Sequence, residues 1–259
     1  MIYVTGDTHG EFDCFTKAWR NRLPFEMTEE DSCIVCGDFG LLWQKGGTLT
    51  YNLKWLSRLP FRILWVQGNH ENYDMIAEYP IEEWNGGKVR HIVRDRIILL
   101  ERGQVFHIEG KSFFTFGGAS SHDIQGGILN KNSPEFAVKL RLAVRNDLPF
   151  RVLNETWWAA ELPTDEEILE ARKNLAAADY RVDYVITHCA STRIQKALEQ
   201  YYLAEEPEHY LYAPDRLTDY FDELDEKLHF RKWHFGHYHD HVVIDDKHTL
   251  LYHQIVPIE

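Results

Sequence analysis

The first third of the chain alternates short apolar runs with polar loops. Three runs of four or five residues are rich in β-branched and aromatic side chains, and each leads into a loop that contains Gly followed by Asp or Asn. These runs are Ile2–Thr5, Ser32–Cys36 and Arg62–Val66. Apolar residues at helical spacing follow within Glu11–Arg22 and from Thr48 to Leu56. Repeated alternation of strand and helix predicts an α/β architecture with right-handed crossovers between neighbouring strands.

The middle of the chain carries a different pattern. Four extended runs are separated by turn residues such as Gly103 and Glu109–Lys111, which predicts an antiparallel meander. The runs are Val89–Val93, Arg96–Leu100, Val105–Ile108 and Ser112–Phe116. The regular pattern weakens over residues 124–163, where Pro134 is placed to open a helix. We interpret this stretch as an excursion within a single domain of residues 1–259, because neither end has a low-complexity linker.

Regular elements return in the last third of the chain. Thr164 followed by Glu167 is a capping box, which predicts the start of a helix. The spacing of apolar residues over Asp215–Leu228 predicts an amphipathic helix. The expected elements are a helix from Thr164 to about Ala178, a strand at Tyr184–Thr187, helices beginning at Ser191 and Asp215, a strand at Arg231–Phe235, and a hairpin of Val242–Ile244 with Thr249–Tyr252.

Composition narrows the functional classes. The formal net charge of −13 disfavours non-specific binding to nucleic acid, because an acidic surface repels the phosphate backbone. A metal-neutralised pocket still admits a small phosphorylated ligand. No run of about 18 apolar residues exists, so no membrane span is expected, and the sequence from Met1 lacks a signal-peptide pattern. We therefore expect a cytoplasmic protein.

The four cysteines do not suggest a disulfide framework. Cys33 and Cys36 have the spacing of redox or zinc sites, but they lie in an apolar run and no second Cys pair follows. That setting favours a buried structural role for both thiols.

Side chains of metal-ligand type recur in the loops that follow the expected strands. These residues are Asp7, His9, Asp38, Asn69, His188, His237 and His239. In open α/β sheets, ligands bind beyond the carboxyl ends of the strands. A mixture of carboxylate, amide and imidazole suits divalent ions such as Mn, Fe, Zn, Ni or Co. Seven ligands exceed the needs of one tetrahedral ion and fit two ions that share a carboxylate.

Two further features support one shared site. Gly37, Gly68 and Gly236 each precede a proposed ligand, which favours a close approach of backbone at these points. Two metal ions about 3.5–4 Å apart can hold a hydroxide and stabilise charge during displacement at phosphorus. His70 is left over from the ligand set, and a His beside such a centre can donate a proton to the leaving oxygen.

These motifs resemble those of the calcineurin-like metallophosphoesterases. All five are present in family order and span residues 6 to 239: Gly6–Gly10, Gly37–Asp38, Gly68–Glu71, Thr187–His188 and Gly236–His239. The resemblance implies a four-layer α/β/β/α sandwich with two mixed β-sheets and a dinuclear metal site at the carboxyl ends of the strands. It also implies a hydrolase acting on phosphoric ester bonds with two divalent ions, of which Mn is favoured.

The resemblance assigns a role to each motif residue. Asp7, His9 and His239 bind the first metal. Asn69, His188 and His237 bind the second. Asp38 bridges both ions, His70 donates a proton and contacts the phosphate, and Glu71 supports its loop. In the protein serine/threonine phosphatase branch, the second motif continues into an Asp and an Arg that orient the catalytic His and grip phosphate. This chain has Leu41-Leu42 there, so a phosphoprotein phosphatase is disfavoured and the partner of His70 is not identified.

Several residues outside the motifs allow two interpretations. His122 and Asp123 either face the rim of the site or lie in a solvated loop. Arg141, Arg145 and Arg151 of the excursion either reach a substrate phosphate or, more simply, form an exposed helix face. For Trp157-Trp158, core packing is favoured over a substrate pocket.

The sequence thus predicts a phosphoesterase that attacks a phosphate mono- or diester with a metal-bridging hydroxide, with His70 as proton donor. The alternative is a non-catalytic scaffold of the same fold that binds protein partners. Such scaffolds usually lose metal ligands or the proton-donor His, and this chain retains both, which favours the enzyme. A small phosphorylated molecule is the expected partner, while its identity, the native metals and the oligomeric state are open.

Overall fold

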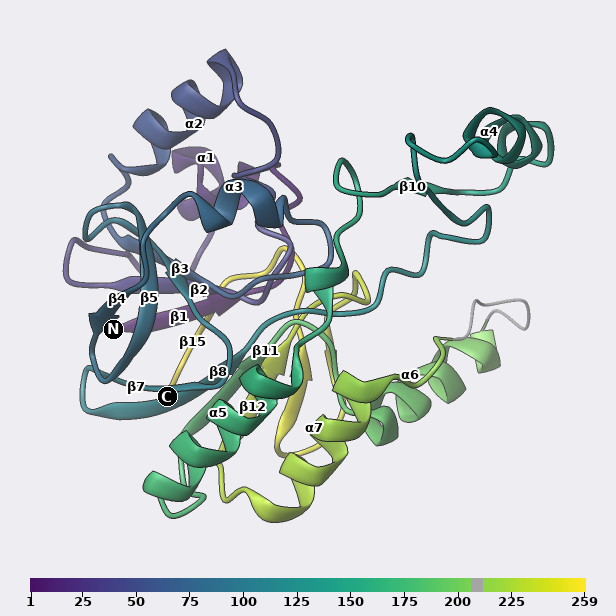
Figure 1. Ribbon diagram of the computed structural model, residues 1–259. Helices are drawn as coiled ribbons and strands as arrows, with labels where there is room; N and C mark the ends of the chain where they lie inside the picture. The colour runs from purple at the N-terminus through teal and green to yellow at the C-terminus, as the bar shows by residue number, and fades with distance from the viewer. Residues whose placement is uncertain (206–211) are drawn as a thin grey trace.

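A computed structural model describes residues 1–205 and 212–259, and two β-sheets form its centre (Figure 1). The first sheet has seven strands in the order β15-β1-β2-β3-β6-β5-β4. They are β1 (Ile2–Thr5), β2 (Ser32–Val35), β3 (Arg62–Trp65), β4 (Glu82–Trp84), β5 (Gly87–Val93), β6 (Ile97–Leu100) and β15 (Val256–Pro257). β1, β2, β3 and β6 are mutually parallel. β15 pairs antiparallel to β1, β5 pairs antiparallel to β6, and β4 pairs antiparallel to β5.

The second sheet has six strands in the order β13-β14-β12-β11-β8-β7. They are β7 (Gln104–Ile108), β8 (Lys111–Phe116), β11 (Tyr184–Thr187), β12 (Lys232–Phe235), β13 (Val242–Val243) and β14 (His248–Leu250). β8, β11, β12 and β14 are parallel, whereas β7 and β13 pair antiparallel at the two edges. Both sheets are therefore mixed, as expected.

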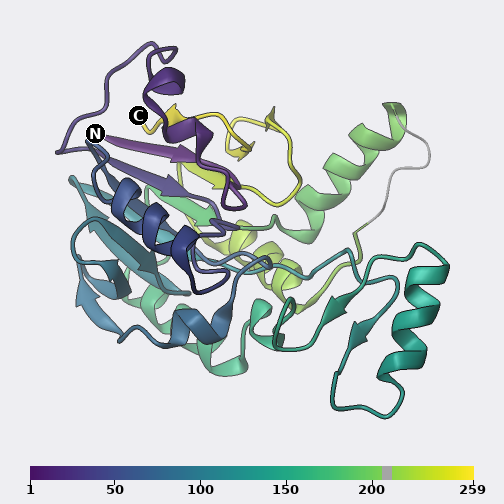
Figure 2. The same cartoon turned by 90° about the horizontal axis from the view of Figure 1, so that it is seen from above.

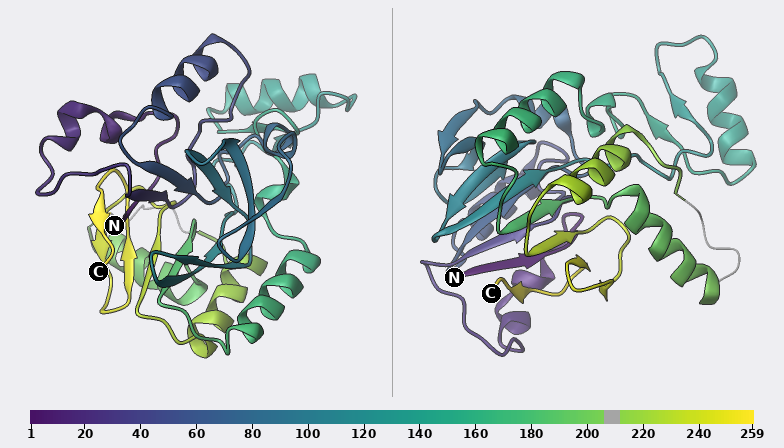
Figure 3. Two further views of the ribbon diagram at one scale, coloured as in Figure 1. Left: turned by 90° about the vertical axis from the view of Figure 1, so that its left-hand side faces the viewer. Right: turned by 90° about the horizontal axis from the view of Figure 1, so that it is seen from below.

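Helices cover the outer faces of the two sheets (Figure 3). On the first sheet lie η1 (Asp13–Phe15), α1 (Lys17–Arg20), α2 (Gly47–Leu56) and α3 (Tyr73–Ala77). On the second lie α5 (Asp165–Ala177), α6 (Thr192–Glu205) and α7 (Arg216–Lys227). No helix in these described ranges has the length and apolar character needed to cross a membrane.

Alternate side chains of β1 show why this strand is buried along its whole length. Ile2 and Val4 face the second sheet, where they join a core that includes Phe113 and Ile186. Tyr3 between them faces the outer helices. Successive strand residues point to opposite faces, so a strand covered on both sides needs an unbroken apolar run. The result is the predicted four-layer α/β/β/α sandwich.

Two expectations for local structure are wrong. The runs in the middle of the chain do not form one meander, because β6 lies in the first sheet and β7 in the second. The chain crosses between sheets near Gly103, which has φ +70 and packs against Ala171 of α5. The helix expected over Glu11–Arg22 is interrupted at Thr16, whose extended backbone ends η1 and whose side chain caps α1.

The excursion extends beyond the sheets (Figure 2). It contains β9 (Ile128–Leu129), α4 (Phe136–Arg145), β10 (Arg151–Val152) and η2 (Ala159–Glu161). β9 and β10 pair with each other in a separate two-stranded sheet. α4 forms where a helix after Pro134 was expected and stands at the far end of the excursion in both views (Figures 1 and 2).

Candidate metal centre

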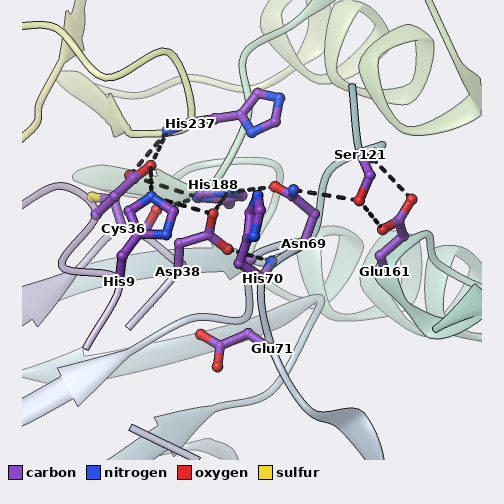
Figure 4. Close-up of polar contacts among 12 residues, drawn as sticks. His9, Cys36, Asp38, Asn69, His70, Glu71, Ser121, Glu161, His188 and His237 are labelled. Atoms are coloured by element: carbon purple, nitrogen blue, oxygen red, sulfur yellow. Dashed lines mark hydrogen bonds and ion pairs between the residues drawn. The ribbon is translucent and has the colours of Figure 1, made fainter. Parts of the chain in front are cut away.

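The loops after five parallel strands meet at one edge of the sandwich. β1, β2 and β3 of the first sheet deliver Asp7 and His9, Asp38, and Asn69. β11 and β12 of the second sheet deliver His188 and the His237–His239 segment. Figure 4 shows this convergence of side chains from separate loops. The structure therefore brings all seven predicted ligand residues to one place.

Asp7, His9 and His239 form the first group. Asp7 Oδ2 lies 3.7 Å from His9 Nε2 and 3.4 Å from His239 Nε2. The two imidazole Nε2 atoms are 2.9 Å apart. These donor atoms are close enough to hold one ion among them. The group is the same set of three that the resemblance assigns to the first metal.

Asp38 lies between this group and the next. Its Oδ2 is 3.8 Å from His9 Nε2 and 3.4 Å from His188 Nε2. Oδ1 accepts a hydrogen bond from the His70 backbone N–H at 2.7 Å. Oδ2 is buried without a hydrogen-bond partner. A buried carboxylate oxygen lacking a partner is costly, and a cation at this point would satisfy it.

The second group is centred on His188. Its Nδ1 donates to the Cys36 carbonyl at 2.7 Å, which leaves Nε2 as the nitrogen for a metal. Asn69 Oδ1 lies 3.1 Å from that Nε2. The His237 ring centroid is 5.0 Å from that of His188. Among the described residues, however, His237 is outside the three tightest donor groups, and its backbone N–H instead donates to Asp7 at 2.9 Å.

The electrostatics of the cluster favour a bound cation. Burial alone raises the pKa of Asp7 and Asp38, but His188 and neighbouring groups hold both values below the usual range. Burial likewise opposes protonation of His188, yet Asp38 and Asp7 raise its pKa to about 9. Two buried carboxylates thus draw a proton onto the imidazole between them. The carboxylate, amide and imidazole donors fit divalent metal, which would supply the same positive charge.

The backbone is strained at the predicted ligands. His9, Asp38, His237 and His239 all have positive φ, between 44 and 74. Such conformations cost energy in non-Gly residues and concentrate at functional sites. Gly37 and Gly236 allow the close approach that their positions suggested. A Cβ on Gly37 would lie 2.2 Å from the His188 ring, and one on Gly236 would lie 2.0 Å from Asp7 Oδ1.

Comparison with known families agrees with this geometry. A sequence model of the calcineurin-like phosphoesterase family matches residues 1–241. The chain belongs to that family. No curated protein sequence matches it. Among solved structures, it is similar to the crystal structure of phosphopantetheinyl hydrolase from Mycobacterium tuberculosis, with 17% identity and a TM-score of 0.46, over 97% of this chain and 87% of that chain.

Glu71 supports the loop that carries Asp38 in this calcineurin-like phosphoesterase. Its Oε1 accepts the Phe39 backbone N–H at 2.9 Å. Burial, followed by the charge of Asp38, raises the pKa of Glu71 well above its ordinary value. Glu71 is therefore held in contact with the second motif, which matches its predicted supporting role.

His70 lies at the edge of the cluster and has an unexpected neighbour. Its ring centroid is 5.2 Å from that of His9. Arg151 Nη2 lies 2.7 Å from His70 Nδ1 and 3.0 Å from Nε2. Burial lowers the pKa of His70 to about 4, and Arg151 adds to the shift while Asp38 opposes it. With this pKa the ring is neutral at neutral pH.

Sequence reasoning left two interpretations open for Arg151 and for Asp123, and the structure places Arg151 against His70 with Asp123 paired to it. Asp123 forms an ion pair with Arg151, which contacts His70, so Asp123 faces the rim of the site rather than lying in a solvated loop. Arg151 is on β10, and the expectation of an exposed helix face is wrong for it. That expectation is correct for Arg141 and Arg145, which are exposed on α4. The available signal was Leu41-Leu42, where the resemblance left His70 without a partner.

Two cavities flank the cluster. One of about 510 Å³ is lined by His9 and His70, by Trp43, and by residues 45–49 at the start of α2. The other, of about 310 Å³, is lined by His237 and residues 119–122 among others. The first falls within the size range of small-molecule sites. The proposed proton donor thus faces a space large enough for part of a small substrate.

For Trp158 and for the two cysteines Cys33 and Cys36, the structure supports the structural interpretation over the functional one. Trp158 is buried, donates from Nε1 to Asp74 at 2.8 Å and contacts the Trp43 ring edge-on. Cys33 and Cys36 are buried free thiols, and burial raises the pKa of both well above the usual value. These cysteines have the expected structural role.

Proposed function

We propose that this calcineurin-like phosphoesterase hydrolyses a small phosphate mono- or diester with the help of two divalent ions. The first ion would be held by Asp7, His9 and His239, the second by Asn69, His188 and His237, and Asp38 would contact both. The position of Asp38 carries the proposal, because its unpartnered Oδ2 faces His9 of one set and His188 of the other.

The protein side chains have separate tasks in this proposal. Two bound divalent ions would supply Lewis acidity at phosphorus and an activated water. Glu71 keeps the Asp38 loop in place through Phe39, and the Cys36 carbonyl fixes the tautomer of His188. These contacts hold the ligand set in position before substrate arrives.

His70 is assigned the transfer of a proton to the leaving oxygen. It lines the 510 Å³ cavity, so that cavity is the proposed position of the leaving group. The lowered pKa of His70 keeps the ring neutral at neutral pH, but a phosphoryl group beside it adds negative charge and raises that pKa again. Substrate binding and protonation of His70 therefore support each other.

The test is hydrolysis of aryl phosphate mono- and diesters after loading with Mn, the metal we propose to try first, and then with Fe, Zn, Ni and Co. Loss of a positioned proton donor lowers the rate by about 10²–10⁴-fold, so His70→Ala should lose activity by this factor while it keeps bound metal. Absence of turnover with every metal, together with His70→Ala behaving like the parent, would contradict the proposal.

Metal content separates the enzyme from a non-catalytic scaffold. A chain that uses this edge for catalysis should bind about two ions under loading conditions. Fewer than one ion per chain would favour the scaffold. The buried free thiols also suit a reducing compartment, which is why a cytoplasmic location belongs to the proposal.

A further inference from the structure

Arg151 belongs to the excursion, yet its side chain lies against the proposed proton donor. Residues 70 and 151 are 81 positions apart, and Nη2 of Arg151 is within 3.0 Å of both ring nitrogens of His70. The side chain of Arg151 is only 12% exposed. A neutral imidazole has a single acceptor nitrogen, so at most one of these contacts is a hydrogen bond to the ring. The guanidinium of Arg151 therefore contacts the His70 ring closely, but it cannot donate hydrogen bonds to both ring nitrogens at once.

Asp123 holds the guanidinium at this position. Its Oδ1 accepts from Arg151 Nε at 2.9 Å, and its Oδ2 accepts from Nη2. This paired arrangement restricts the orientation of the planar guanidinium group. Asp123 lies directly before the excursion, and Arg151 lies on its returning strand, where its backbone N–H donates to the Gly127 carbonyl at 3.2 Å. The ion pair therefore joins both limbs of the excursion beside the metal centre.

The N–H groups on Nη1 of Arg151 make only a weak hydrogen-bond contact. Nη1 makes a contact of 3.4 Å with the Thr156 carbonyl, which is long for a hydrogen bond. An oxygen hydrogen-bonded to His70 would lie about 3 Å from the ring. That oxygen would then be within about 6 Å of Nη2 of Arg151, close enough for the guanidinium charge to act on a phosphoryl group. A phosphoryl group is the ligand that best matches a planar cation in this position.

We infer that Arg151, oriented by Asp123, binds the phosphoryl group of the substrate beside His70 and favours phosphate monoesters over diesters. This inference rests on the proposed phosphoesterase function and names the substrate class of the same site. A monoester carries two negative charges near neutral pH and a diester one, so an added positive charge stabilises the monoester more. The excursion would thereby contribute directly to substrate choice.

The experiment compares Arg151→Ala and Arg151→Lys with Arg145→Ala in the Mn-loaded protein. Arg145 is exposed on α4 of the same excursion, so its removal makes the same change in net charge away from the site. The measurements are kcat and KM for an aryl phosphate monoester and diester, and inhibition by inorganic phosphate. Thermal unfolding of each variant reports whether the fold is retained.

For Arg151→Ala, we expect kcat/KM for the monoester to fall by about 10–100-fold, the range for losing a charge-assisted hydrogen bond. Inhibition by inorganic phosphate should weaken about 10-fold. The kcat/KM for the diester should fall by about threefold or less, because a diester carries less negative charge for Arg151 to stabilise. Arg151→Lys should recover part of the monoester rate, and Arg145→Ala should match the parent. Asp123→Asn should show a weaker form of the Arg151→Ala pattern.

Equal losses for monoester and diester with unchanged phosphate inhibition would overturn the inference and leave Arg151 a structural support of His70. A match between Arg151→Ala and Arg145→Ala in an active parent would overturn it as well. An inactive parent would instead contradict the proposed function. Calorimetric titration of the Mn-loaded parent and Arg151→Ala with inorganic phosphate then tests Arg151 by itself, and equal affinities would reject its role.

Discussion

The metal cluster and the excursion hold their polar groups in different ways. Asp7 and Asp38 lie in the loops that follow two buried strands, and their side chains are only 0% and 1% exposed. Arg151 instead sits on a two-residue strand, and nearby α4 exposes apolar side chains to solvent. The groups that would bind metal are thus part of the core, whereas the group that would select the substrate belongs to a lightly packed addition.

This difference separates reaction chemistry from substrate choice. Substitutions in the sheets are expected to shift the buried carboxylates, and they should also affect the strained backbone beside them. Changes in β9, α4 or β10 should leave the two large sheets intact, because β9 and β10 pair only with each other in the described structure. Mutations in the two regions should therefore give different kinds of defect, and this expectation can be tested.

The largest effect is expected from Asp38→Asn. The substitution keeps the side-chain shape but removes the charge that faces both His9 and His188. Groups that only orient ligands are worth about 10–100-fold, so removal of this charge should reduce kcat/KM by more than about 100-fold and lower the content of bound Mn. Turnover and metal analysis measure the two effects.

Asp147→Asn provides the matched control for that loss. Asp147 is exposed in the excursion and has φ 51, a conformation that Asn also tolerates. The control makes the same change in charge and should keep metal and activity. An Asp38→Asn protein with full metal content and turnover would show that the essential charge lies elsewhere.

The second comparison concerns stability. Phe113 is fully buried between the sheets and stacks on Tyr184 with ring centroids 5.2 Å apart. Phe113→Ala should lower the free energy of unfolding by about 3–5 kcal/mol, because it leaves a cavity in a packed core. Val144→Ala on the exposed side of α4 should change it by about 0.5 kcal/mol or less. Denaturant unfolding measures both, and similar costs would contradict the contrast between core and excursion.

Much of the fold and the gathering of the site residues could be predicted from the sequence, because both depend on local signals. A strand buried on both faces must be an apolar run, and the loop after it carries the polar group. Local hydrogen bonding is equally readable: Thr164 and Glu167 make both contacts of the expected capping box. The roles of the individual ligands remain predictions.

The parts that were not predictable depend on partners far away in the chain. The run at Val105–Ile108 alternates in the same way whichever sheet it joins, so its pattern did not reveal that β7 leaves the sheet of β6. The contact of Arg151 with His70 is decided by the path of the whole excursion. Nothing in the residues beside Arg151 distinguishes it from Arg141 or Arg145.

The smallest effect is expected on the exposed face of α4. Val138, Leu142 and Val144 are 57%, 50% and 65% exposed. Replacing all three with Ser should change the free energy of unfolding by about 0.5 kcal/mol or less per site and leave kcat/KM for the monoester unchanged. The reason is that the Arg151–Asp123 ion pair, rather than α4, holds the guanidinium against His70.

Enzyme assays and denaturant unfolding of the triple variant test this expectation. A loss of monoester activity comparable with that of Arg151→Ala would show that α4 itself positions the returning strand. The boundary between core and excursion would then have to move outward to include the helix. Unchanged kinetics would instead restrict the functional part of the excursion to the segment between Asp123 and the strand that carries Arg151.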